Sequence, residues 1–76
     1  MRQSLTERVV LAIKVEMLRQ NLSTNDLAVQ LDESYLWLNR RLKRVTPFLL
    51  EDVQRVADAL HVSLVQLIAE DQVKVA

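Results

Sequence analysis

The side chains best suited to bind a charged ligand lie in one stretch, SYLWLNRRLKR, residues 34–44. Four cations fall within its last five positions with no acidic residue among them, and the amide of Asn39 directly precedes them. Guanidinium and ammonium groups bind anions, and an amide both donates and accepts hydrogen bonds. An aromatic and leucine-rich turn comes just before this group. The stretch can therefore be core, a protein contact or a surface that reads nucleic acid.

The composition leaves few side chains for other chemistry. Cysteine is absent, so the chain forms neither a disulfide nor a thiolate metal site, and His61 is the one histidine. Nucleophile, base and metal ligands do not occur together at a recognisable spacing. We therefore expect no enzyme, no metal, no cofactor and no small-molecule substrate. His61 is expected to sit at a helix end near the last carbonyls.

Charge and hydropathy limit the class of protein further. Ten basic and ten acidic residues cancel, unlike the balance of a nonspecific nucleic-acid coat, but the clustered cations predict one basic face. The longest apolar run, residues 9–13, is far too short for a membrane span or a signal peptide. We therefore expect a cytoplasmic protein with no membrane contact.

The length of 76 residues fits one domain, residues 1–76. A chain this short has a marginal core, so a dimer would help it. Glycine is absent and Pro47 is the single proline, a composition that favours packed helices over a turn-rich β fold. The end of the chain, residues 70–76, is expected to be a flexible tail.

Serine caps and helical spacing predict five short helices. We expect them over residues 5–20, from Ser23 to Asp32, from Ser34 to Lys43 or Arg44, from about Leu50, and from Ser63 onward. Off the main stripe of the first helix, Val10 and Leu11 are expected to be partly exposed. The apolar residues at core spacing are Leu5, Val9, Ile13, Met17, Leu27, Ala28, Leu31, Leu38, Leu42, Val53, Val56, Ala57, Leu60, Leu64, Leu67 and Ile68.

The second and third helices fit the pattern of a helix-turn-helix, over about residues 23–43. They are short and are joined by about three residues. The small Ala28 falls one turn before the connection, where two steeply crossing helices would approach most closely. On the third helix, Leu38 and Leu42 are four residues apart and can face the core, so the side chains of Tyr35, Asn39, Arg40 and Lys43 project elsewhere.

Three motifs carry a resemblance to a known family: LSTNDLAVQL, NRRLKRVTPF and VQRVADALHVSLVQLI. With them, the segment from Leu22 to Ile68 resembles the Cro/C1-type (XRE-like) family of phage repressors and related bacterial regulators. The resemblance implies an all-α, five-helix lambda-repressor-like DNA-binding domain. It also implies a transcriptional regulator of the repressor or Cro kind that acts in a bacterial or phage-infected cell. Such proteins commonly bind a two-fold-symmetric operator in double-stranded DNA as a homodimer.

The chain departs from the family at its turns. Glycine is usual where this chain has Asp32, Arg44 and His61, and a hydrophobic residue is usual where it has Glu33. Aspartate tolerates the left-handed backbone conformation better than most residues, so we expect the turn after the second helix to persist.

Carried over position by position, the resemblance implies a recognition surface on the third helix. Arg40 can contact guanine and Asn39 adenine, each through two hydrogen bonds in the major groove. Thr24 and Ser34 can donate to phosphates at the starts of their helices. The resemblance implies base contacts from Ser34, Tyr35, Leu36, Asn39 and Arg40, and phosphate contacts from Thr24, Lys43 and Arg44.

Other readings of the same residues stay open. The cations can simply be a solvated helix end that the helix dipole favours, and Arg41 can pair with Glu51 or Asp52. Trp37 is expected in the core or at its boundary. If the aromatic turn is instead exposed, a second function becomes plausible, a protein-binding antirepressor or phage modulator of a host protein on the same fold. Its anchor would be Tyr35, Leu36 and Trp37.

Overall fold

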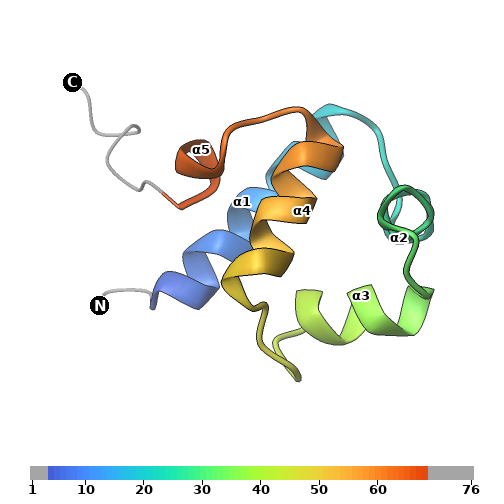
Figure 1. Ribbon diagram of the computed structural model, residues 1–76, viewed down its shortest axis with the longest axis horizontal. Helices are drawn as coiled ribbons and strands as arrows, with labels where there is room; N and C mark the ends of the chain where they lie inside the picture. The colour runs from blue at the N-terminus through green and yellow to red at the C-terminus, as the bar shows by residue number, and fades with distance from the viewer. Residues whose placement is uncertain (1–3, 69–76) are drawn as a thin grey trace.

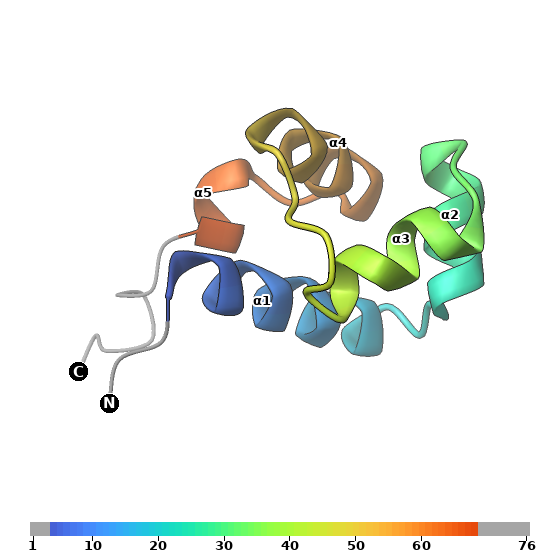
Figure 2. The ribbon, with the colours of Figure 1, turned by 90° about the horizontal axis from the view of Figure 1, so that it is seen from below.

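Residues 4–68, the part of the chain that the computed structural model describes, form five helices and no strand. This confirms the expected all-α class, while the expected tail at residues 70–76 lies outside the described residues. α4 lies across α1. At one end of the molecule α2 packs against α3, and at the other end α5 lies beside the start of α1 (Figure 1, Figure 2). The helices are α1 (Leu5–Arg19), α2 (Thr24–Leu31), α3 (Tyr35–Leu42), α4 (Leu50–Leu60) and α5 (Leu64–Ile68).

Serine caps open four of these helices, at the positions that the sequence predicts. In α1, Ser4 Oγ accepts the Glu7 N–H at 3.1 Å while the Glu7 carboxylate accepts the Ser4 N–H at 3.0 Å. Each such cap satisfies a backbone N–H that has no partner within the helix. The remaining caps are Ser23 with Asp26, Ser34 with the Trp37 N–H, and Ser63 with Gln66.

The cap of α2 also has a pH dependence. The backbone N–H of Ser23, and then its hydroxyl, hold the pKa of Asp26 below its ordinary value because both bonds favour the charged carboxylate. A carboxyl group whose pKa is lower in the folded chain than in the unfolded chain stabilises the fold at pH values above the unfolded pKa. That contribution is lost as the pH falls through the folded pKa.

The core is built from the residues expected at helical spacing, except that Leu64 and Ile68 are only partly buried against it and that Val10 and Leu5 differ from expectation. Val10 is only 4% exposed, against the expectation of partial exposure, because α1 contacts α3, α4 and α5 and is covered over more than one stripe. Leu5 is 55% exposed because it lies in the first turn, at the edge of an open pocket. Leu11 is half exposed, as expected. The buried apolar cluster is Val9, Ile13, Met17, Leu27, Ala28, Leu31, Leu38, Leu42, Val53, Val56, Ala57, Leu60 and Leu67.

The first four helices end in the same way, although the chain contains no glycine. The first residue after α2 and α4, and the second residue after α1 and α3, takes positive φ, and the next N–H bonds back to a carbonyl five residues earlier. After α2 the N–H of Glu33 donates to the Ala28 carbonyl at 2.9 Å. The expected left-handed turn at Asp32 is confirmed, with φ 61° and ψ 39°. The left-handed residues are Asn21, Asp32, Arg44 and His61.

The left-handed position at the end of α4 gives a stability prediction. His61 is exposed at φ 62°, where a side chain with a Cβ costs about 1–2 kcal/mol. Glycine removes that cost, but it destabilises the fold by roughly 0.5–1 kcal/mol because it gives the unfolded chain more backbone entropy. We expect His61→Gly to raise Tm by several degrees in a thermal unfolding experiment. His61→Val should lower it, and equal Tm values for the two variants would contradict the strain.

Candidate nucleic-acid interface

α2 and α3 cross steeply at one end of the molecule. In Figure 1, α2 is seen nearly end-on, whereas α3 runs across the view. The small Ala28 is 1% exposed, and Leu38 of α3 is fully buried with it in the core. The turn between the helices is tied to α4, because Arg55 Nη1 donates to the Glu33 carboxylate at 3.0 Å. Arg55 Nη2 also donates to the Leu31 carbonyl at 2.6 Å. α3 is therefore held as part of the rigid core.

One face of α3 points away from the core. Leu36, Arg40 and Lys43 are spaced by four and three residues, which places them in one row on a helix of 3.6 residues per turn. All three are exposed, whereas Leu38 and Leu42 on the other side are buried. We call these three residues the outer row. Neither Arg40 nor Lys43 has a carboxylate within ion-pair distance in residues 4–68.

A groove runs beside the outer row, between α1, the start of α2 and the end of α3. Its volume is about 390 Å³. The half-buried Asn39 lies in its wall rather than on the outer row, and Thr24 lies there too. Lys43 borders both surfaces. The lining residues are Lys14, Met17, Leu18, Leu22, Ser23, Thr24, Asn39, Leu42 and Lys43.

Lys14 is a candidate that the sequence analysis missed. It is exposed on α1 and lines the groove together with Lys43, although 29 positions separate the two lysines in the sequence. Within the described range, no carboxylate pairs with Lys14. No local pattern marks this residue, because its neighbourhood is created only when α1 packs against α3. The groove thus brings together two unpaired cations.

Arg41, the neighbour of Arg40, is a structural residue. Its Nη1 donates to the Trp37 carbonyl at 2.9 Å, and its guanidinium lies 3.9 Å from the centre of the Trp37 ring. Its Nε lies 3.7 Å from Asp52 Oδ2, so of the two acids that the sequence left open the partner is Asp52 and not Glu51. Arg41 is mostly buried and belongs to the junction between α3 and α4.

The aromatic turn, Tyr35, Leu36 and Trp37, also contains both packed and exposed side chains. Trp37 is half-buried, packs on the core and meets Phe48 edge to face at 6.4 Å between ring centres. The expected boundary position of Trp37 is therefore confirmed. Tyr35 and Leu36 keep 52% and 53% of their surfaces exposed. Of the three aromatic-turn residues, only these two are well exposed.

Of the three other predicted contact residues, Arg44 and Ser34 make contacts within the chain and Thr24 lines the groove. Arg44 Nη1 lies 3.2 Å from Glu7 Oε2, but both side chains are well exposed, so this pair is weak and can exchange for another anion. Ser34 Oγ accepts the Trp37 N–H at the start of α3, which leaves its own O–H free to donate. Thr24 is half-buried in the groove wall. Each position keeps a donor near the surface.

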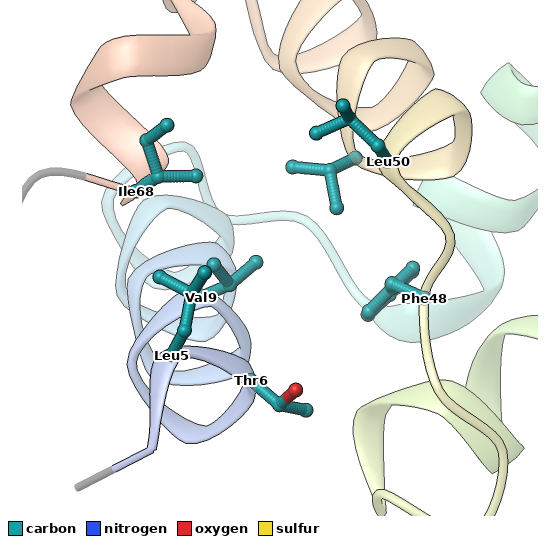
Figure 3. A pocket seen from close by; sticks show the side chains of 7 residues that line it. Leu5, Thr6, Val9, Phe48, Leu50 and Ile68 are labelled. Carbon is teal, nitrogen blue, oxygen red and sulfur yellow. The ribbon is translucent and has the colours of Figure 1, made fainter.

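A second hollow lies at the opposite end, between α1, α4 and α5 (Figure 3). Leu5, Thr6 and Val9 face Phe48 and Leu50 across a pocket of about 190 Å³. No side chain that lines it titrates, so the pocket itself offers no general acid or base. In residues 4–68, no three potential metal ligands converge, and no helix has the length and apolar content to cross a membrane.

Comparison of the chain with protein-family models, with curated proteins and with solved structures returned no match.

The contacts of Asp52 give a prediction about how α3 is held. Its carboxylate accepts the Leu49 N–H at 3.0 Å and is the partner of the mostly buried Arg41. Asp52→Ala removes both contacts, and we expect it to lower the free energy of unfolding by about 2 kcal/mol in urea titrations. Glu51→Ala, in the same helical turn but exposed, should cost under about 0.5 kcal/mol. Equal losses would contradict a special role for Asp52.

Proposed function

We propose that this chain is a sequence-specific DNA-binding transcriptional regulator, a helix-turn-helix protein of the phage repressor or Cro kind. α3 enters the major groove, and the protein blocks transcription by occupying an operator. The observation that carries the proposal is the outer row, in which two cations without carboxylate partners among residues 4–68 stand on a helix whose opposite face is buried core. A rigid helix that presents cations in register is what reading base edges requires.

The division of labour among the cations supports the proposal. Arg41 is engaged with Asp52 and Trp37, whereas Arg40, one residue earlier, is free to make two hydrogen bonds to guanine. Lys43 stands at the end of the row, where a phosphate would be the nearest anion. Ser34, Tyr35, Leu36 and Asn39 complete the proposed base-contacting set.

The groove supplies phosphate contacts beside the base-reading row. Lys14 and Lys43 lie on its rim, and the Thr24 hydroxyl is available at the start of α2. Phosphate contacts fix the position of the protein on the duplex without reading sequence. A groove with two lysines that meet no carboxylate in the described part of the chain suits one DNA backbone strand, while α3 occupies the adjacent major groove. Arg44, once released from Glu7, adds a further contact.

We propose that the active form is a homodimer in the cytoplasm of a bacterial or phage-infected cell. A two-fold-symmetric operator needs two copies of α3 spaced by one helical turn of DNA, about 34 Å. One copy alone offers only a small recognition surface, the outer row and the groove. The two-fold arrangement doubles that surface.

A second function is favoured by the exposure of Tyr35 and Leu36. Exposed apolar side chains on a rigid helix also suit a protein partner, and the alternative is an antirepressor or phage modulator of a host protein. Trp37 contributes little to such an anchor, because it is half-buried between Arg41 and Phe48. The anchor is thus reduced to two side chains.

Selection of bound duplexes from a random pool tests the proposal. We expect one enriched motif whose affinity for the protein falls steeply with salt. Arg40→Ala should cost about 1–3 kcal/mol and relax the preference at one base pair, whereas Lys43→Ala should weaken binding to all sequences alike. Salt-independent or absent DNA binding, together with capture of one host protein that Leu36→Ala abolishes, would establish the alternative function instead.

Lys14 gives a separate prediction about the groove. Lys14→Gln should weaken binding to all duplexes and reduce the slope of log affinity against log salt concentration by about one. Arg19→Gln is the matched control, because Arg19 lies on the same helix but pairs with Glu16 at 3.5 Å and does not line the groove. A salt slope that both variants change equally would show a general charge effect and not a phosphate site.

A further inference from the structure

The outer row of α3 combines one apolar side chain with two cations. Leu36 stands at its N-terminal end, about half exposed, one helical turn before Arg40. A single exposed leucine on a protein surface needs no explanation. On the proposed recognition helix its position has a consequence, because Leu36, like Arg40, would be pressed against base edges that lose their water.

An apolar side chain finds only one apolar complement in the major groove. Guanine, adenine and cytosine present hydrogen-bond donors and acceptors there, whereas thymine also presents its C5 methyl group. A leucine over any other edge would exclude water from polar atoms without replacing the lost hydrogen bonds. Thymine is therefore the base that Leu36 selects with the smallest desolvation cost.

Leu36 and Arg40 are spaced so that they can contact two different base pairs of the same half-site. Four helical residues rise about 6 Å, and base pairs along one strand are about 3.4 Å apart. The two side chains thus reach positions about two base pairs apart when α3 lies along the groove. Seven residues from Leu36 to Lys43 rise about 10.5 Å, which carries the lysine beyond the bases read by the other two.

We infer that Leu36 is a specificity-determining residue that reads a thymine methyl group, about two base pairs from a guanine that Arg40 reads. This inference rests on the proposed function and defines its substrate class, operators with a thymine and a guanine at that spacing in each half-site. Tyr35 is outside the row and carries a hydroxyl, which can bond to a polar edge or a phosphate.

Replacing thymine by deoxyuridine tests the inference, because deoxyuridine keeps every hydrogen-bonding group and loses only the methyl. The full chain selects its duplex from a random pool, and each thymine of that duplex is then replaced in turn, in both half-sites at once. At the position about two base pairs from the conserved guanine, we expect affinity to fall about fourfold for each methyl removed. For Leu36→Ala, the thymine and deoxyuridine duplexes should bind equally.

Leu11→Ala is the matched control, since it shortens a half-exposed leucine on α1 and should keep the sensitivity to deoxyuridine. Because Leu36 is exposed, its replacement by alanine should leave thermal unfolding almost unchanged. If a motif is selected but deoxyuridine is tolerated at every position, the methyl contact is wrong and the proposed function stands. If Leu36→Ala keeps the full deoxyuridine effect, another side chain reads the methyl. Failure to select any duplex would overturn the proposed function, and this inference with it.

Discussion

The position of α3 depends on one buried carboxylate, that of Asp52. It is the only charged side chain classed as buried among residues 4–68, and a carboxylate removed from water needs compensating partners. The N–H of Leu49 at the start of α4 is one partner, and the guanidinium of Arg41 from α3 is another. Because Arg41 is held toward α4, rotation of α3 about its own axis would break this contact. Arg40, the preceding residue, is rotated from Arg41 by about 100° around the helix axis and is thereby directed outward.

Local signals in the sequence predicted most of the helical framework. A serine cap depends on residues only three positions apart, so Ser4, Ser23, Ser34 and Ser63 were enough to place four helix starts. The start of α4 has no such signal in its cap residue, because the cap is Leu49 and its N–H is satisfied from within the helix by Asp52. That helix was placed by the spacing of its apolar residues alone.

Features that arise from packing between helices could not be predicted in the same way. Arg40 and Arg41 are identical and adjacent, yet one is exposed and the other stacks on Trp37. The sequence indicated that Arg41 can pair with Glu51 or Asp52 but not which of the two acids it contacts. Val10 and Lys14 show the same limit, because the burial of one and the groove position of the other depend on which helices lie against α1.

Trp37 is the only tryptophan of the chain, and it lies where α3 meets α4, with the guanidinium groups of Arg41 at 3.9 Å and Arg55 at 5.6 Å from its ring centre. The intrinsic tryptophan fluorescence of the protein therefore comes from this one junction. Its emission responds when the chain unfolds or when α3 shifts against α4. The protein thus carries an intrinsic optical probe of the contact between α3 and α4.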